Sequence, residues 1–149
     1  MKLTKHQEAS ILLLDISGKG GKDTEIATAL GFERKSARFY DAIDSTGEKW
    51  EFKKQQDTQW IDPYKLSELS KEQKKIKILF FMHKKGKVTE IYETDYKKLI
   101  KSMGYSARDL KAIKKMYDRQ SLSSRRTQIK AELKGSEIKV FKKVWQKNP

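Results

Sequence analysis

The chain has 149 residues, a length that fits one domain built around one hydrophobic core. It carries 34 basic and 20 acidic residues, and the net charge of +14 favours a polyanionic partner, nucleic acid before a membrane surface. Cysteine is absent, which excludes a disulfide framework, a thiolate zinc site and a cysteine nucleophile. Only two histidines, His6 and His83, are present, and this small number argues against a histidine-based metal cluster or a Ser-His-Asp triad.

No segment predicts membrane insertion or export. The longest apolar run, Ile11 to Leu14, is far too short to cross a bilayer. Met1 and Lys2 are followed by polar residues, unlike a secretion signal. We therefore expect an intracellular, cytoplasmic protein.

Two helices are predicted in the first thirty residues. The first spans Thr4 to Ser17 and has an apolar side. The second begins at Asp23 or Thr24 and ends at Leu30, before Gly31. The residues expected on the apolar side of the first helix are Ala9, Ile11, Leu12 and Leu14.

Asp41 and the triplet Glu51-Phe52-Lys53 form the motif with the clearest chemical content. They lie in a predicted hairpin whose strands, Phe39 to Ile43 and Lys49 to Lys54, are joined by a turn over residues 44–47. Alternation along the second strand directs Glu51 and Lys53 to one face and Phe52 to the other. The hairpin brings Asp41 opposite or diagonal to Glu51. Facing carboxylates repel each other, but they suit a divalent cation such as Mg²⁺.

Three neighbours of this motif are assigned structural or peripheral roles. Asp44 is expected to be a turn residue that bonds to its own backbone. Trp50 is expected in the core. Lys54 faces away from Lys53 and is expected to contact phosphate or remain a solvated charge.

The central part of the chain predicts the clearest hairpin, Lys77 to His83 paired with Lys87 to Glu93. Its first strand is almost wholly apolar, as expected for a central strand buried on both faces. A short helix over Ser67 to Lys75 precedes this hairpin, and a helix over Asp95 to Lys101 follows it.

The last third of the chain begins with a helix that starts at Ser106, where Ser106 and Asp109 form an imperfect capping box. A loop over Ser121 to Arg126 follows. A final hairpin pairs Thr127 to Leu133 with Glu137 to Val144 around Gly135-Ser136. The apolar side of the helix is expected to comprise Leu110, Ile113, Met116 and Tyr117, with lysines on its other side.

These elements predict an α/β or mixed α+β domain, with a central mixed sheet flanked by helices, over residues 1–149. The pattern that begins at Asp41 and ends at Glu51-Phe52-Lys53 resembles the PvuII-like type II restriction endonucleases of the PD-(D/E)xK nuclease superfamily. The gap and the residues at Gly47 and Trp50 also match, and fainter similarity extends over most of the chain. The resemblance implies a restriction-endonuclease-like fold and Mg²⁺-dependent hydrolysis of double-stranded DNA at a short palindromic site, leaving a 5′-phosphate and a 3′-hydroxyl.

The resemblance also implies the roles of the motif residues. Asp41, Glu51 and Lys53 would be catalytic. One or two Mg²⁺ ions would be held by Asp41, Glu51 and the backbone carbonyl of Phe52. Lys53 would position or deprotonate the attacking water and neutralise charge on the phosphate.

Residues that contact DNA are expected at three places. The segment over residues 18–22 lacks the spacing of a P-loop and is expected to be a flexible turn, in which Lys19 and Lys22 would touch the DNA backbone. Glutamines after the motif strand would pair with adenine, and arginines before the final hairpin would read guanine or hold phosphate. These last residues are Gln56, Gln59, Arg125 and Arg126. The segment after the motif departs from the family, since Trp60-Ile61-Asp62-Pro63 stands where a histidine-rich segment is usual.

Cleavage of both DNA strands needs two active sites, which predicts a homodimer. The resemblance places the dimer interface in the helical segment of residues 1–30, particularly Leu3 to Leu30, and the catalytic and recognition core in residues 31–149. A DNA methyltransferase acting on the same site would be the expected functional partner.

Three alternatives remain open at this point. Glu51 and Lys53 could be solvent-facing residues of an edge strand. The chain could be a PD-(D/E)xK nuclease of low sequence preference, of the phage type. It could also be a non-catalytic basic DNA-binding protein in which the acidic pair is incidental.

Overall fold

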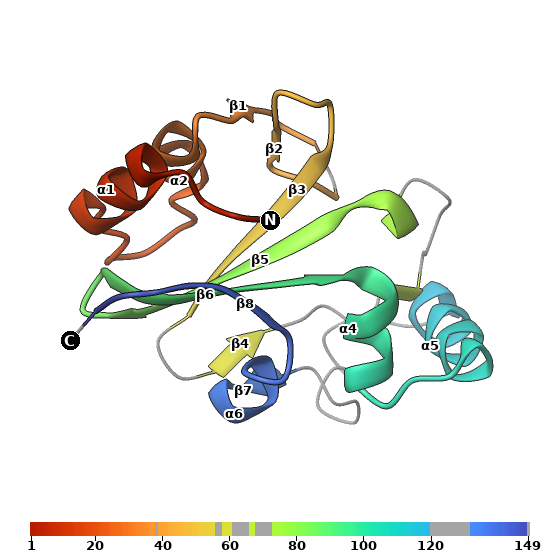
Figure 1. Ribbon diagram of the computed structural model, residues 1–149. Coiled ribbons are helices and arrows are strands. Elements are labelled where there is room, and N and C mark those ends of the chain that lie inside the picture. The colour runs from red at the N-terminus through yellow and green to blue at the C-terminus, as the bar shows by residue number, and fades with distance from the viewer. Residues whose placement is uncertain (38, 56–57, 61–65, 68–72, 120–131, 149) are drawn as a thin grey trace.

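A six-stranded mixed sheet, with strand order β1-β2-β3-β5-β6-β8, forms the centre of the protein (Figure 1). The computed structural model describes residues 1–37, 39–55, 58–60, 66–67, 73–119 and 132–148. The strands β3 and β5 are parallel, and the other neighbours in this sheet are antiparallel. The strands are β1 (Glu33–Arg34), β2 (Ala42–Ile43), β3 (Lys49–Gln55), β5 (Lys77–Lys84), β6 (Lys87–Asp95) and β8 (Lys142–Gln146).

Both central hairpins predicted from the sequence are confirmed, although the first strand, expected from Phe39 to Ile43, is limited to Ala42–Ile43. β2 pairs with β3 around the turn that contains Gly47, and β5 pairs with β6 around the turn that contains Gly86. Both glycines have positive φ angles, of 85° and 86°, which a side chain at these positions would disfavour. The β5 strand is buried on both faces, because alternate residues enter two different hydrophobic clusters.

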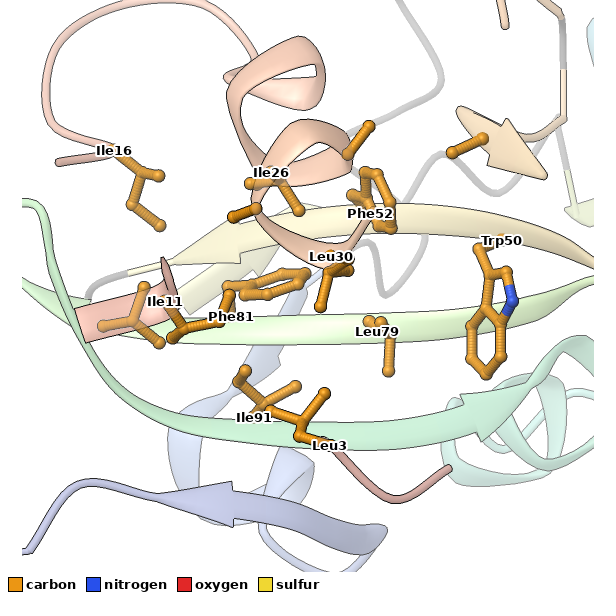
Figure 2. Packing of buried hydrophobic residues seen from close by; sticks show 14 residues of the cluster. Leu3, Ile11, Ile16, Ile26, Leu30, Trp50, Phe52, Leu79, Phe81 and Ile91 are labelled. Atoms are coloured by element: carbon orange, nitrogen blue, oxygen red, sulfur yellow. The ribbon is translucent and has the colours of Figure 1, made fainter. Parts of the chain in front are cut away.

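One face of the sheet is covered by α1 (Lys5–Leu13) and α2 (Asp23–Leu30), as Figure 1 shows. Side chains from both helices pack on residues of β3, β5 and β6, and Figure 2 shows this packing from close by. Trp50 is 2% exposed in this cluster, so its prediction as a core residue is confirmed. The main members of the cluster are Leu3, Ile11, Ile16, Ile26, Leu30, Trp50, Phe52, Leu79, Phe81 and Ile91.

The opposite face packs against α4 (Tyr96–Ser102) and α5 (Ala107–Arg119). The start of α4 is capped by Asp95, whose side chain accepts a hydrogen bond from the N–H of Lys98. The start of α5 carries the predicted Ser106–Asp109 box, with reciprocal bonds of 2.8 and 3.1 Å. The buried side chains on this face include Ile78, Phe80, Met82, Tyr92, Tyr96, Leu99, Ile100 and Leu110.

The first helix is shorter than the predicted Thr4 to Ser17, because it ends at Leu13. Leu14 is already extended, and the N–H of Ile16 donates to the carbonyl oxygen of Gly86 at 2.9 Å. Ile16 is also fully buried. The chain leaves the helix because pairing with the β5–β6 turn satisfies its backbone and buries an isoleucine.

The predicted final hairpin is wrong. β7 (Glu132–Lys134) pairs with β4 (Thr58–Trp60) in a separate two-stranded sheet, and β8 pairs with β6. Between them, residues Gly135–Ile138 form the short helix α6, capped by Glu137 through a 3.1 Å bond from the N–H of Lys134. Burial of Ile138 and this cap favour a helical turn over a hairpin turn.

Two further predictions fall partly or wholly outside the described residues. The expected helix over Ser67 to Lys75 is represented by a 3-10 turn at Gln73–Lys75, and the loop over Ser121 to Arg126 lies wholly outside. No helix in the described part of the chain is long and apolar enough to span a membrane.

Candidate active site

β3 carries the motif triplet at an interior position of the main sheet, between β2 and β5. Phe52 enters the cluster under α1 and α2, whereas Glu51 and Lys53 are level with Ile78 and Phe80, whose side chains belong to the opposite face. Glu51 is only 7% exposed. The alternative of solvent-facing residues on an edge strand is therefore excluded.

Glu51 and Lys53 form an ion pair on this face. The ammonium nitrogen of Lys53 lies 3.7 Å from Oε1 of Glu51. Burial of a carboxylate is costly unless an opposite charge or hydrogen bonds compensate for it. Lys53 provides part of that compensation and holds its ammonium group beside the buried acid.

Asp41 is attached to β3 by both its backbone and its side chain. Its N–H donates to the carbonyl oxygen of Trp50 at 2.7 Å, and its Oδ2 accepts from the N–H of Phe52 at 2.7 Å. Asp41 lies just before the β2–β3 ladder, where Ala42 is level with Trp50, and its two bonds join it to the residues on either side of Glu51. The prediction that the hairpin brings these two acids opposite or diagonal to each other is confirmed.

The backbone carbonyl of Phe52 faces the same edge of β3 as the Asp41 carboxylate. In a strand, the N–H and C=O of one residue point to the same side, and the N–H of Phe52 points to Asp41. β2 pairs with β3 only at Lys49 and Trp50, so the ladder does not extend to this carbonyl. The carbonyl therefore faces the edge of β3 at which the Asp41 carboxylate is bonded.

Tyr96, the first residue of α4, is bonded to the chain two residues before Asp41. Its hydroxyl donates to the carbonyl oxygen of Phe39 at 3.2 Å, and the residue is 2% exposed. Burial raises the pKa of Tyr96 strongly, and the negative charges of Glu51 and Asp41 raise it further. The Tyr96–Phe39 bond therefore ties the start of α4 to the chain that carries Asp41.

Asp23 and Arg34 also belong to this region, although the sequence did not indicate them. Burial raises the pKa of Asp23, as do the charge of Asp41 and a hydrogen bond to that carboxyl group, while Arg34 and Lys53 oppose the shift. Arg34 Nη1 donates to the carbonyl oxygen of Asp41 at 2.8 Å, and its Nη2 lies 3.6 Å from Oδ2 of Asp23. Asp23 resembled a simple helix-start residue, and the strand that carries Arg34 had no recognisable pattern.

The oxygen donors at this position suit a hard cation. Mg²⁺ is commonly held by one or two carboxylates while it retains several waters. Within the described residues, no group of three or more acidic or histidine side chains is placed to hold a metal. The oxygen donors available to such an ion are the carboxylates of Asp41 and Glu51 and the Phe52 carbonyl, and water and phosphate oxygens would have to complete its coordination.

The structure describes three of the six residues that were predicted to contact DNA. Lys19 is exposed in the glycine-rich turn. Lys22 is partly buried just before α2, next to Asp23. Gln59 lies in β4, level with Leu133 of β7. The remaining three, Gln56, Arg125 and Arg126, lie outside the described residues.

Two neighbours of the motif have structural roles. Asp44 accepts bonds from the N–H groups of Thr46 and Glu48, at 2.9 and 3.0 Å, as expected for a turn residue. Burial alone would raise the pKa of Asp44. These bonds, together with those from the Thr46 hydroxyl and the Trp50 indole, outweigh burial and lower the pKa. Lys54 is neither a solvated charge nor a free phosphate contact, because its ammonium group donates to backbone carbonyls at 2.9 and 3.1 Å.

In comparisons with known proteins, the chain matches no protein-family model and no curated protein.

Proposed function

We propose that the protein is a Mg²⁺-dependent type II restriction endonuclease with the fold of the PD-(D/E)xK superfamily. It would hydrolyse phosphodiester bonds in double-stranded DNA at a short palindromic site and leave 5′-phosphate and 3′-hydroxyl ends. One observation carries the proposal. The Asp41 carboxylate is bonded to the backbone of the same strand that holds buried Glu51 and its ion-pair partner Lys53.

The residues of this region supply the parts that such a reaction needs. Asp41 and Glu51 would hold the ion, with the Phe52 carbonyl as a further donor. When bound, Mg²⁺ would polarise the scissile phosphate and lower the pKa of a coordinated water. Lys53 would orient the attacking water and offset the negative charge that develops on the phosphate.

The acid pair is held before any substrate arrives. The bond from the Phe52 N–H fixes one oxygen of Asp41, and the sheet fixes Glu51 on the adjacent strand. Fixed groups of this kind avoid reorganisation during the reaction, which is how enzymes gain most from electrostatic interactions. Tyr96 holds the chain just before Asp41 through its bond to the carbonyl oxygen of Phe39.

Cleavage of both DNA strands would need two active sites, which a homodimer would provide. Leu12 and Leu13 of α1 are 50% and 83% exposed, while Ile11 beside them is fully buried. The helix thus presents apolar side chains both to the core and to the outside. The exposed pair suits contact with a second copy of the chain.

Incubation of plasmid DNA with the protein and Mg²⁺, followed by sequencing of the fragment ends, tests the proposal. Discrete fragments with one common end sequence are expected. A smear would instead indicate the low-preference nuclease, and binding without any Mg²⁺-dependent cleavage would indicate the non-catalytic DNA-binding protein.

Variants connect the cleavage to the site. Lys53→Ala and Glu51→Gln should lose cleavage but still bind duplex DNA, which also shows that they fold. Lys74→Ala, at an exposed lysine outside the site, is the control and should cleave normally. Equal cleavage by Lys53→Ala and the control would refute the assignment.

A further inference from the structure

The net charge of the protein is concentrated in its last third. Residues 1–95 contain 18 basic and 16 acidic residues, whereas residues 96–149 contain 16 basic and 4 acidic residues. The motif residues all lie in the nearly neutral first part. The positive charge that would attract a polyanion therefore lies on elements other than those that carry the acids.

α4 places three of these charges on one side. Tyr96, Leu99 and Ile100 are buried against the sheet, while the three lysines of the helix are exposed. Residues three and four positions apart share one face of a helix, so these lysines form a single outward stripe. They are Lys97, Lys98 and Lys101.

α5 repeats the arrangement. Leu110 and Ile113 are buried, and four basic residues, Arg108, Lys111, Lys114 and Lys115, are exposed. The acidic residue on this exposed stretch is Asp109, whose carboxylate accepts a bond from the N–H of Ser106 at 2.8 Å. The seven exposed residues of the two helices are named here the α4–α5 basic surface.

Most of this surface is not neutralised by the protein itself. In the part of the chain that the structure describes, no ion pair involves the α4 lysines, Lys111 or Lys115. Other lysines have carboxylate partners, such as Lys35 with Glu33 at 2.9 Å and Lys77 with Glu48 at 3.1 Å. Several unpaired like charges on adjacent helices repel each other, a cost that a bound polyanion removes.

The surface begins at the candidate active site. Tyr96 opens α4 and donates to Phe39, two residues before Asp41, and its pKa responds to both acids. Lys97 and Lys98 follow directly in the chain. With a rise of about 1.5 Å per residue, Lys101 lies roughly one helical turn further from the site.

The geometry points to the α4–α5 basic surface as a second contact for duplex DNA, which holds the phosphate backbone on the flank of the bond that is cut. This inference rests on the proposed function. An anionic membrane fits less well, because interfacial helices insert an apolar face, and the apolar residues of α4 and Leu110 and Ile113 of α5 are already buried in the protein.

Binding of fluorescent duplex DNA to the full chain, measured by anisotropy over a range of KCl concentrations in EDTA, tests the inference without cleavage. Two charge-matched double variants remove part of the surface: Lys97→Gln/Lys101→Gln on α4 and Lys111→Gln/Lys115→Gln on α5. The control is Lys84→Gln/Lys85→Gln at the exposed β5–β6 turn. That turn lies at the far end of β6, nine residues and about 30 Å from α4.

Each lost phosphate contact reduces the slope of log K against log salt by about 0.9. Each surface variant should therefore lower the slope by up to about 2, and the control by less. The surface lies beside the cut site, so only a longer duplex would reach it. The decrease in slope should therefore be large on a duplex of about three helical turns and small on one of about one turn.

The outcomes separate this inference from the proposed function. If the surface variants and the control have the same salt slope on the long duplex, the inference is overturned, even if the wild-type protein cleaves DNA. Reduced slopes in a protein that cleaves nothing would retain the surface as a DNA contact and remove the nuclease. Weaker binding to vesicles rich in phosphatidylserine, with DNA binding unchanged, would overturn the inference in favour of a membrane contact.

Discussion

The side chain of Asp41 accepts a hydrogen bond of 2.7 Å from the backbone N–H of Phe52, at the position where β2 stops pairing with β3. A carboxylate thus takes the place that a strand carbonyl would occupy in a longer ladder. The bond gives Asp41 a structural role in addition to its proposed role as a metal ligand. Substitutions that separate these two roles are therefore informative.

Asp41→Asn and Asp41→Ala should both lose Mg²⁺-dependent cleavage by at least about 100-fold, the upper range for changes around metal ligands. Their stabilities should differ. Asparagine retains an oxygen for the Phe52 N–H, whereas alanine leaves this partly buried donor unpaired, at a cost of about 1–3 kcal/mol. Urea unfolding combined with plasmid cleavage measures both effects. Full cleavage by the asparagine variant would contradict the metal-ligand role.

Substitutions of the adjacent lysines Lys53 and Lys54 should have different effects, the first on DNA cleavage and the second on stability. Lys53→Gln should lose cleavage because it removes the ammonium group beside Glu51. Lys54→Gln should retain cleavage but lower the free energy of unfolding by about 1–3 kcal/mol, because it loses charge-assisted bonds to the carbonyl oxygens of Ile16 and Gly18. The two variants have the same net charge, so a general loss of DNA attraction affects both equally.

Gly86→Ala should destabilise the protein by at least about 2 kcal/mol. A Cβ at this position would lie 2.7 Å from the backbone nitrogen of Ser17 and against the Asp15 carboxylate, at a φ of +86°. Gly47→Ala is the matched control, with a φ of +85° and open space around the Cβ, and should cost only about 1–2 kcal/mol of backbone strain. Equal midpoints of urea unfolding for the two variants would refute the contact with residues 15–17.

His83 should make stability depend on pH. Burial and the charge of Lys54 lower the pKa of His83 below its ordinary value of 6.5, while Asp15 opposes the shift. A lowered pKa means that the unfolded chain binds the proton more tightly, so the stabilisation is complete above pH 6.5 and declines as the pH falls through the lowered pKa.

The Nδ1 atom of His83 accepts a bond from the N–H of Gly86 at 3.1 Å, and protonation of Nδ1 would remove this bond. Between pH 7 and pH 5, the wild-type protein should therefore lose about 1 kcal/mol more than His83→Gln. Urea titrations at several pH values measure the difference. Parallel pH profiles for the two proteins would exclude this role of the ring.

Leu12→Lys/Leu13→Lys should convert a dimer to a monomer, because it places charges on the exposed apolar positions of α1. Val140→Lys is the control at another apolar residue, 75% exposed, and should remain dimeric. Sedimentation velocity measures the assembly directly. A variant that sediments like the wild-type protein would place the dimer contact elsewhere.

The local elements around the motif were predictable because each depends on residues close together in the chain. Alternation and the turn at Asp44 predicted the β2–β3 hairpin, and this hairpin brings Asp41 against the backbone on either side of Glu51. The Ser106–Asp109 pair likewise predicted the start of α5. In each case the bonds join residues at most eleven positions apart, including that from Phe52 to Asp41.

The partnerships of β4 and β7 were not predictable in this way. Residues 58–60 pair with residues 132–134, and the expected hairpin over residues 127–144 competed for the same strand. Short strands carry little pattern, so burial of Leu133 and Ile138 decided between the two arrangements. Asp23 is a similar case, because a helix-start acid shows no local sign that it will lie against Asp41.

By itself, the sequence determined the acid-x-lysine strand, its hairpin with Asp41 and the excess of positive charge. These depend on side-chain alternation, turn chemistry and composition, which act over short distances along the chain. Only the tertiary structure decided that β3 lies inside the sheet, that Glu51 is buried there, and that Arg34 bonds to Asp41 and pairs with Asp23. Those relationships arise from packing between segments distant in sequence, where the gain in buried apolar surface selects one arrangement.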